Sequence, residues 1–252
     1  ARRTGSPRGA APVTGERRSR ILARLVGDDG ADLGTARLCE VCSDVTGMSG
    51  AGIMLMSGDV AQGSICTTNE LSARIEELQF ELGEGPCVDA YHQDRPVLEP
   101  DLAAPATPRW LAFTGPAIED GVRAIFGFPL QLGAVRLGAL NLCRDRPGPL
   151  TSEQHADALV VAGVAAQAVL VMQANAPPGK LAEELEASAD FQYVVHQASG
   201  MVAAQLDISV GRALIRLKAH AFGNDRPLDE IARDVIDRTL RFDAASCEKD
   251  PQ

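Results

Sequence analysis

The stretch AIFGFPLQLGAVRLGALNLC, residues 124–143, decides the fold. Apolar residues run through both of its halves, and Gly133 lies between them, where a tight turn needs a residue that tolerates a left-handed backbone. Pro147-Gly148-Pro149 follows and ends the second half. The sequence therefore predicts an antiparallel hairpin with strands at 124–132 and 135–143.

The regions on either side of this hairpin alternate between helical and extended patterns. Thr151 and Gln154 form a capping-box pattern that opens a long apolar helix ending near Met172. This order of elements predicts an α+β fold with an antiparallel sheet flanked by helices. The other expected elements are a helical region from 19 to 45, strands at 51–57, 63–68 and 96–99, short helices at 87–92 and 110–120, and a segment at 71–80 that is either helix or loop.

A second, wholly helical unit follows the break Ala176-Pro177-Pro178-Gly179. A long helical pattern covers 180–205 and connects the two units. Ser209 can cap a second helix at 210–222, and Pro227 suits the first turn of a third helix that reaches 241. The sequence therefore predicts two domains joined by a long helix.

The formal net charge is −10 and is unevenly distributed. Residues 1–20 contain six Arg and one Glu, so this arm carries +5 and the remainder carries −15. An acidic body argues against non-specific binding to nucleic acid or to anionic membranes. The arm lacks the apolar core of a secretory signal, and the longest apolar run, 158–172, is too short to span a membrane. We therefore expect a cytoplasmic protein without a membrane partner.

The six cysteines are expected to be reduced thiols in that compartment. Cys39 and Cys42 lie in an apolar helical stretch with no second pair to complete a zinc site, so we interpret them as core residues, with redox sensing as the alternative. Cys87 follows Gly85-Pro86 at an expected helix start, which can lower a thiol pKa, but packing is the favoured interpretation. Cys143 ends a strand and is also interpreted as core.

The remaining polar residues form no recognisable catalytic motif in the sequence. The four histidines are scattered and form neither a catalytic triad nor a zinc-protease motif, and no phosphate-binding loop of the Gly-x-x-x-x-Gly-Lys type is present in the sequence. We therefore expect no catalytic residues, no metal site and no cofactor, and we interpret the protein as a non-enzyme.

Three strings in the first unit carry a family resemblance: ELGEGPCVDA (81–90), FGFPL (126–130) and LGALNL (137–142). Together with the order of elements over about 20–172, they resemble the GAF domains of bacterial regulators. The resemblance implies a sensor domain with a pocket for a small-molecule ligand between the sheet and its flanking loops, at about 71–100 and 110–121. It does not identify the ligand or its contacts.

Two strings in the second unit carry a sharper resemblance: VVHQASGMV (194–202) and ALIRLKAHAF (213–222). With NDRPL (224–228) and the apolar pairs at 231–232 and 235–236, they resemble the signatures of ANTAR domains. The resemblance implies a three-helix module that binds paired RNA hairpins in leader transcripts and prevents a terminator from forming. Ser199 departs from the pattern, because the family often has a basic residue there, and this weakens the transfer of RNA contacts to the first helix.

Charge counting restricts where RNA can bind. Residues 188–243 contain seven Lys and Arg and eight Asp and Glu, a net charge of −1, so the module is not basic overall. No acid lies between Asp207 and Asp225. Within this window Arg212, Arg216 and His220 share one face of the expected helix. An apolar stripe for the core lies opposite, at Val210, Leu214, Leu217 and Ala221.

The expected RNA-contacting residues come from this window and from the motif. Few phosphate contacts imply modest, salt-sensitive affinity, which two paired copies would raise. The alternative interpretation is that these are ordinary solvated helix residues. The candidates are Arg212, Arg216, Lys218 and His220 on the second helix, Arg226 at the following turn, and Ala198 in the first signature, which the ANTAR resemblance implies.

The helix at 180–205 is too long for a compact three-helix module, so its early turns must pack elsewhere. Leu181 and Leu185 are spaced for one seam, and Phe191, Val195, Ala198 and Val202 for another. The apolar helix at 158–172 is a further candidate surface. We therefore expect a homodimer through these helices; the alternative is a monomer that folds them back.

The domain organisation and function follow from these expectations. The leading hypothesis is a ligand-responsive RNA-binding regulator of transcription termination. One alternative is a sensor whose C-terminal helices only dimerise, and another is a GAF-type enzyme that reduces free methionine sulfoxide with pocket cysteines. The predicted organisation is a disordered basic arm at 1–19, a GAF-like sensor domain at 20–174, a linker with the start of the long helix at 175–187, an ANTAR domain at 188–243 and a disordered tail at 244–252.

Overall fold

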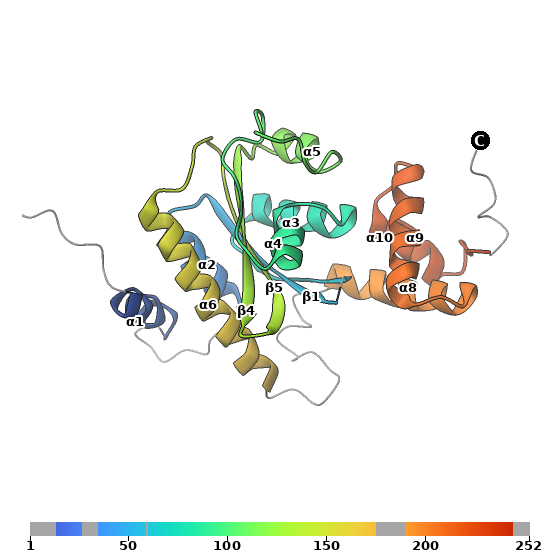
Figure 1. The fold of residues 1–252 in the computed structure, drawn as a ribbon. Coiled ribbons are helices and arrows are strands. Elements are labelled where there is room, and N and C mark those ends of the chain that lie inside the picture. The colour runs from blue at the N-terminus through green and yellow to red at the C-terminus, as the bar shows by residue number, and fades with distance from the viewer. Residues whose placement is uncertain (1–13, 27–34, 59, 175–189, 244–252) are drawn as a thin grey trace, which may run out of the picture.

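The computed structural model describes residues 14–26, 35–58, 60–174 and 190–243, which form a larger and a smaller unit (Figure 1). The larger unit is built on a five-stranded antiparallel sheet with the strand order β2-β1-β5-β4-β3. Helices cover both faces of this sheet, as the α+β prediction requires. The strands are β1 (Gly50–Ser57), β2 (Val60–Thr67), β3 (Val97–Glu99), β4 (Ala124–Leu132) and β5 (Val135–Arg144).

The β4–β5 pair confirms the predicted hairpin. Leu132 pairs with Val135 beside the turn, and Gly133 has the positive φ of 59° that favours glycine. Away from the turn, where Val135 is 52% exposed, most apolar residues of both strands are buried on both sides of the sheet, because helices cover both faces. The hairpin therefore connects the two layers of core in this unit.

One face of the sheet is covered by α1 (Thr14–Val26), α2 (Thr35–Thr46) and α6 (Ser152–Ala174). The Thr151–Gln154 capping box opens α6 as predicted: the Gln154 amide donates to Thr151 Oγ1 at 3.1 Å, and the Thr151 amide donates to Gln154 Oε1 at 3.0 Å. Within the described ranges α6 alone is long and apolar enough to cross a membrane. Half of its apolar window is buried, which is also typical of a core helix.

Helix α1 begins at Thr14, five residues before the predicted helical start at Ser19. Ile21 and Leu25 are buried against the core, and the Arg17 guanidinium lies 2.5 Å from the Asp157 carboxylate of α6. Both charged groups are at most 8% exposed, so each requires the other as a partner. Part of the predicted disordered arm is therefore a helix whose basic residues fasten it to α6.

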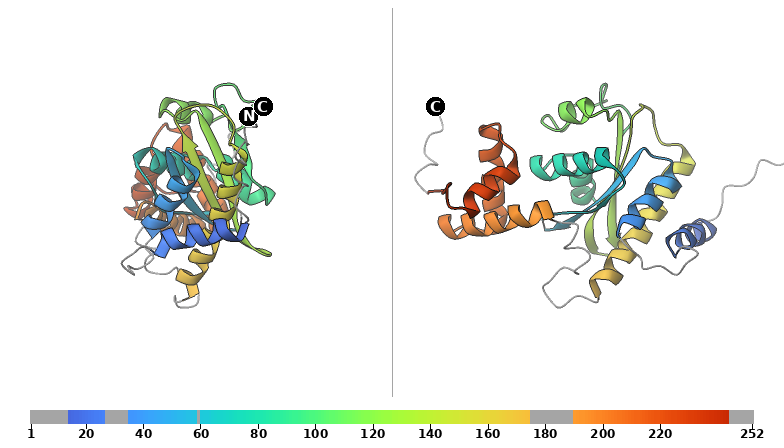
Figure 2. Two further views of the ribbon diagram at one scale, coloured as in Figure 1. Left: turned by 90° about the vertical axis from the view of Figure 1, so that its left-hand side faces the viewer. Right: turned by 180° about the vertical axis from the view of Figure 1, so that it is seen from behind.

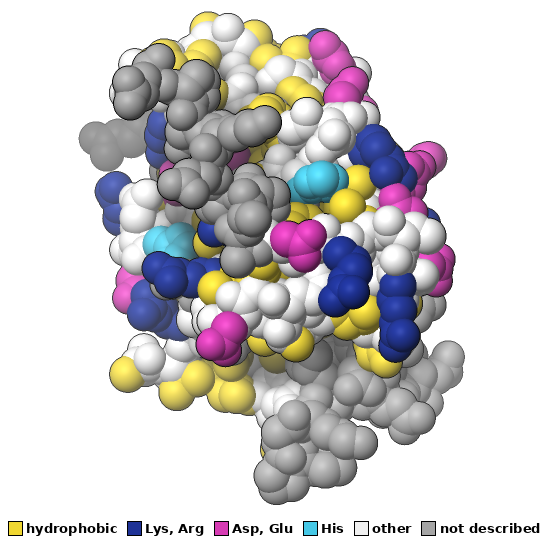
Figure 3. Space-filling view, turned by 90° about the vertical axis from the view of Figure 1, so that its right-hand side faces the viewer, with side chains coloured by type: hydrophobic (Ala, Val, Ile, Leu, Met, Phe, Trp, Pro, Cys, Tyr) yellow, Lys and Arg dark blue, Asp and Glu magenta, His cyan; other side chains and the backbone are white. Residues whose placement is uncertain are grey.

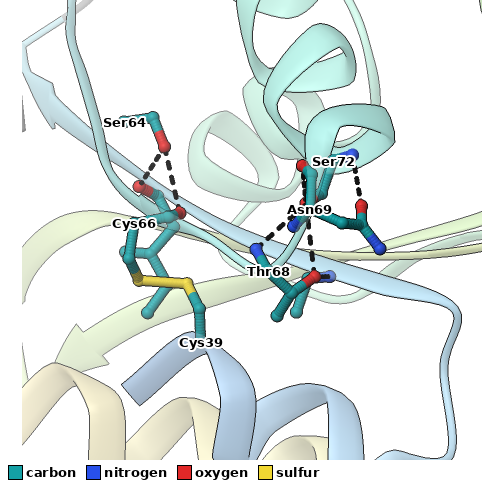
Figure 4. Close-up of a disulfide and its surroundings, with 8 residues drawn as sticks. Cys39, Ser64, Cys66, Thr68, Asn69 and Ser72 are labelled. Carbon is teal, nitrogen blue, oxygen red and sulfur yellow. Dashed lines mark hydrogen bonds between the residues drawn. A yellow bond between two sulfur atoms is a disulfide. The ribbon is translucent and has the colours of Figure 1, made fainter. Parts of the chain in front are cut away.

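The other face is covered by α3 (Glu70–Leu82), α4 (Pro86–Gln93) and α5 (Thr114–Glu119). The ambiguous segment at 71–80 is helical because its start is capped: the Ser72 amide donates to Asn69 Oδ1 at 2.9 Å, and the Asn69 amide donates to Ser72 Oγ at 3.0 Å (Figure 4). Helix α5 is shorter than predicted. Trp110, its expected first residue, has a positive φ of 54° that no α-helix accommodates.

Cys39 of α2 and Cys66 of β2 form a disulfide, which corrects the expectation that all thiols are reduced (Figure 4). The prediction that Cys39 and Cys42 are core residues is confirmed, because both are fully buried. Cys66 is 27 residues away in the sequence and lies opposite Cys39 because α2 packs along β2. Cys42 remains a buried free thiol.

The smaller unit consists of α8 (Asp190–Leu206), α9 (Val210–Gly223) and α10 (Leu228–Ile236). Ser209 caps α9 as predicted, accepting from the Arg212 amide at 3.4 Å. Two expectations are corrected: α10 ends at Ile236 rather than 241, and Val210 is 49% exposed rather than part of the core. The core consists of Val195, Ala198, Val202, Ala213, Leu214, Leu217, Ala221, Leu228, Ile231, Ala232 and Val235.

Several predictions fall on segments outside the described residues. These are the arm before Thr14, the linker and early helical turns at 175–189 with Leu181 and Leu185, and the tail at 244–252. The two units meet where α8 approaches the β1–β2 end of the sheet and where α9 and α10 approach α3 (Figures 1 and 2). Helix α1 lies at the opposite end of the molecule (Figure 2).

Candidate functional site

Helix α9 presents an exposed face opposite its core stripe. Arg212, Arg216 and Ala219 are exposed, and Ile215 and Phe222 are 67% and 73% exposed. Their spacing of three to four residues places them along one side of the helix. Neither guanidinium forms an ion pair with a carboxylate in the described part of the chain. A face with two unneutralised guanidinium groups and an aromatic ring can bind phosphates and stack on unpaired bases.

Two further candidates, Arg226 and His220, lie at the edges of this face, and both contact other side chains of the bundle. The Arg226 guanidinium is paired with the carboxylates of Glu230 at 3.3 Å and Asp234 at 2.8 Å. The His220 ring is half-buried and packs edge-on against Phe242 at 5.2 Å between ring centres. Binding of a phosphate by Arg226 would therefore compete with two acids of its own domain.

Lys218 and Ala198 do not lie on the exposed face. Ala198 is fully buried in the core of the bundle, which corrects the expectation that it contacts RNA directly. The Lys218 ammonium points into the larger unit, where it donates to the Phe80 carbonyl. Ser199 is also fully buried, and its hydroxyl donates to the Val195 carbonyl at 2.7 Å, so it too is a packing residue.

Figure 3 views the end of the molecule formed by the C-terminal helices. Basic side chains are separated there by acidic, apolar and neutral ones rather than gathered in one patch. This distribution agrees with the net charge of −1 for residues 188–243. A polyanion that binds this end would therefore contact a few unpaired guanidinium groups, because the described residues form no broad positive patch on this face.

A buried polar cluster lies between the sheet and α3 in the larger unit. Glu76 is 2% exposed, and Gln79 and Asn141 are fully buried. Neither oxygen of the Glu76 carboxyl, neither polar atom of the Asn141 amide, nor Gln79 Nε2 has a partner with hydrogen-bond geometry among the described residues. Burial raises the pKa of Glu76 to about 8, although the Asn141 amide lowers it in part. Unpartnered buried polar atoms are rare in proteins, so this cluster is a candidate binding site for a polar ligand.

Glycines allow the helices to approach the sheet at this cluster. Asn141 of β5 lies between Gly52 of β1 and Gly127 of β4 in one row across three strands. A Cβ atom at Gly52 would lie 2.7 Å from Glu76 Cγ, and one at Gly127 would lie 2.3 Å from the Pro86 carbonyl oxygen. A side chain at either position would displace α3 or α4, so the row fixes the distance between these helices and the sheet.

Two cysteines border the cluster. Burial and the neighbouring Glu76 raise the pKa of both the Cys87 and the Cys143 thiols, to about 12 for Cys143. The position of Cys87 at a helix start therefore does not lower its pKa, and its burial supports the packing interpretation that the sequence favoured. A thiol of raised pKa is a poor nucleophile at neutral pH. Cys42, the remaining free thiol in the described ranges, lies on the opposite face of the sheet.

A pocket of about 610 Å³ opens at the β2 edge of the sheet. It overlaps the predicted ligand region at α3 and extends to the start of α2, which the sequence did not indicate. Among the described residues no group of three or more His, Cys, Asp or Glu side chains is arranged to hold a metal ion. The pocket is lined by Thr35, Ala36, Ser64, Ile65, Cys66, Thr67, Glu70, Ala73, Arg74, Glu76 and Glu77.

Sequence reasoning missed two parts of these sites. Ile215 and Phe222 are apolar residues that lie outside the core stripe of α9. Helical spacing alone could therefore have predicted that both are exposed. The Glu76–Asn141 cluster had no signal, because these residues lie 65 positions apart in the sequence and come together only when α3 packs on β1 and β2, with Asn141 on the strand beside β1.

Comparison with known proteins concerns the larger unit. Residues 35–171 match the family model described as GAF domain, which covers more than half of the chain. The match ends before the C-terminal helices. No curated protein matches the chain.

Several solved structures are similar to this chain at low identity. The GAF domain from a phosphoenolpyruvate-protein phosphotransferase of Coxiella burnetii is 15% identical, with 63% of this chain and 96% of that chain covered and a TM-score of 0.49. The corresponding Acinetobacter domain is 10% identical, with 64% and 95% covered and a TM-score of 0.47. A type II free methionine-R-sulfoxide reductase from Thermoplasma acidophilum is 15% identical, with 61% and 92% covered and a TM-score of 0.42. With identities this low and TM-scores below 0.5, these structures support no conclusion about this chain.

Proposed function

The chain belongs to the GAF domain family, a family of signal-sensing regulatory modules, and from this premise we propose that it is a signal-responsive RNA-binding regulator of transcription termination. In this proposal residues 188–243 are an ANTAR domain that binds paired RNA hairpins in leader transcripts and prevents a terminator from forming. The resemblance of the strings at 194–202 and 213–222 supports the assignment, together with three short helices in the expected order.

The observation that carries the proposal is the exposed face of α9. Arg212 and Arg216 project from it without carboxylate partners in the described part of the chain, and Phe222 offers an exposed ring on the same side. Most other arginines of the bundle lie close to acids in the sequence. RNA recognition of loops combines guanidinium contacts with stacking, and this face supplies both.

Pairing of two copies is part of the proposal. Two guanidinium groups per chain provide few phosphate contacts, so one copy would bind weakly and two would gain affinity from linkage. Leu159 and Val171 of α6 are 47% and 67% exposed and offer apolar surface for a homodimer. Sedimentation of a monomer at micromolar concentration, both with and without RNA, would contradict this part.

The remaining functional assignments follow from the sensor role. We propose that a small polar molecule acts as the signal at the Glu76–Asn141 cluster, that no cofactor is required, and that the protein is cytoplasmic, without a membrane partner. We also propose that it is not an enzyme. The raised pKa values of the Cys87 and Cys143 thiols support this over a sulfoxide reductase, which needs reactive cysteines.

Substitution of Arg216 tests the RNA interface. Arg216→Ala removes one unneutralised guanidinium from an exposed position, so folding should be unaffected and RNA affinity should fall about tenfold. Arg233→Ala is the matched control, because Arg233 is an exposed arginine of α10 that is paired with Asp229 at 2.5 Å. Gel-shift titrations with a two-hairpin RNA would compare both variants with the wild type; equal affinities for all three would overturn the assignment of this face.

A second candidate function is a sensor whose C-terminal bundle mediates only protein association. The net charge of −1 and the mixed surface of the bundle favour it. The two functions differ in one outcome: an association module retains its oligomeric state but binds no structured RNA at low salt.

A further inference from the structure

The end of α3 and the neighbouring strand β2 contact the C-terminal bundle through three polar pairs. The Lys218 ammonium of α9 donates to the Phe80 carbonyl and lies 4.8 Å from the centre of the Phe80 ring. Phe80 belongs to the last turn of α3, where carbonyls lack partners within the helix and the helix dipole is negative. Lys218 therefore acts as a C-terminal cap for a helix of the other unit.

Glu81 makes the reciprocal contact. Helix α10 begins at Leu228, and its capping residue Pro227 provides no side-chain hydrogen bond. Burial raises the pKa of the Glu81 carboxyl, and the neighbouring Leu228 backbone opposes part of this rise. Glu81 therefore lies beside the start of α10, and its charge also stabilises the buried Lys218 ammonium.

His196 of α8 completes the contact. Its Nε2 atom lies 3.0 Å from the Gln62 carbonyl of β2, and its ring packs edge-on against Phe80 at 6.1 Å. An apolar seam accompanies these polar groups, because Met54, Met56 and Tyr91 of the larger unit share a buried cluster with the bundle core. We refer to the pairs Lys218–Phe80, Glu81–Leu228 and His196–Gln62 as the α3 docking contact.

The α3 docking contact joins two domains of one chain. The ribbon views show the bundle beside the end of α3 and the β1–β2 end of the sheet (Figures 1 and 2). Interfaces between domains of one chain resemble transient protein–protein interfaces unless they are large, so the domains can separate. The docked arrangement is therefore suited to be reversible.

We propose that the α3 docking contact is an autoinhibitory interface in which the GAF domain withholds Lys218 from RNA, so that docking and full RNA binding exclude one another. This inference rests on the proposed RNA-binding function. Lys218 lies in the acid-free window with Arg212 and Arg216. Of these three residues, Lys218 is the one whose charged group donates a hydrogen bond to a carbonyl of the other unit. A phosphate can reach it only after the bundle leaves α3.

Helix α3 also connects this contact to the candidate signal site. On the same helix, Glu76 of the buried polar cluster lies one turn before Phe80, and Gln79 of that cluster directly precedes Phe80. A ligand that supplies partners to Glu76 and Asn141 must enter between α3 and the sheet, where the glycine row leaves no spare space. Its binding would shift α3 and with it Phe80 and Glu81, the two α3 residues of the docking contact.

Glu81→Lys tests the proposal without altering any bundle residue. It places a cation beside Lys218 and removes the carboxylate beside the start of α10, so the contact should open. Hydrogen exchange of the amides at the start of α10 should become about tenfold faster, while the core of α8 and α9 stays protected. Glu119→Lys is the matched control, since it makes the same change of charge at an exposed residue of α5, far from the bundle.

RNA affinity provides the second measurement. Glu81→Lys and the uncharged Glu81→Ala should both bind a two-hairpin RNA about three- to tenfold more tightly than the wild type, and Glu119→Lys should not. Unchanged exchange at α10 in Glu81→Lys would overturn the docking contact. Faster exchange with unchanged RNA affinity would overturn the competition while leaving the RNA-binding function intact. Absence of RNA binding in every variant would instead overturn the proposed function, and exchange alone would then decide whether the two units dock.

Discussion

At the scale of single residues, Glu76 is the most unusual group in the sensor domain. Its carboxyl is buried against Gly52 with no partner in hydrogen-bond geometry among the described residues, and burial raises its pKa to about 8. Burying a carboxylate without a partner is costly, so the protonated form is favoured in the folded protein at neutral pH. Because burying an unpartnered carboxyl group destabilises the fold, a binding role explains Glu76 better than a packing role does.

The pKa of Glu76 predicts how stability depends on pH. Because the folded-state pKa is raised from 4.5 to about 8, this group contributes stability that is fully present below pH 4.5 and lost as pH rises through about 8. Glu76→Gln cannot ionise, so it should be more stable than the wild type at about pH 8 to 9, by an amount on the order of a few kcal/mol. Urea denaturation of both proteins from about pH 5 to about pH 9 measures the difference. A difference that does not change with pH contradicts a buried Glu76 carboxyl.

At the scale of secondary-structure elements, the disulfide joins α2 to the edge strand β2. The crosslink spans 27 residues, which include β1 and the turn between β1 and β2. It also lies at the wall of the 610 Å³ pocket, since Cys66 lines that pocket. The bond therefore restricts the separation of two elements that border a candidate ligand site.

Reduction of this disulfide should destabilise the protein. Loop-closure entropy for a crosslink of this length is worth about 3–4 kcal/mol, so a reductant should lower the free energy of unfolding by about that amount. The Cys39→Ser/Cys66→Ser double variant provides the control, because its stability should not respond to reductant. Equal responses of the wild type and the double variant in urea denaturation would show that the crosslink is not formed.

The elements also show what local sequence patterns can predict. The β4–β5 hairpin, the capping box of α6 and the Ser209 cap of α9 depend on residues close together in the chain, and all three predictions are confirmed. The start of α1 was misplaced because the Arg17–Asp157 pair that fixes it joins residues 140 positions apart. The disulfide was missed for the same reason, since nothing local distinguishes Cys66 from Cys42 as the partner of Cys39.

At the scale of the whole molecule, the two predicted units are present but their contact was not foreseen. Lys218 donates to a carbonyl 138 residues earlier in the sequence. The sequence of α9 alone gives no sign of this partner, so Lys218 was predicted to contact RNA. Ala198 is a similar case, because its motif position indicated function whereas its side chain is fully buried. The candidate RNA face is therefore reduced to Arg212, Arg216 and the adjoining Phe222, with Lys218 added only when the units separate.

The central claim, that the exposed face of α9 binds paired hairpins, is tested most directly by titrating a labelled two-hairpin RNA with the full chain at low salt. Fluorescence anisotropy should show saturable binding, and a single hairpin should bind at least about tenfold more weakly, because only paired sites gain from linkage of two copies. Absence of saturable binding to the two-hairpin RNA would contradict the account.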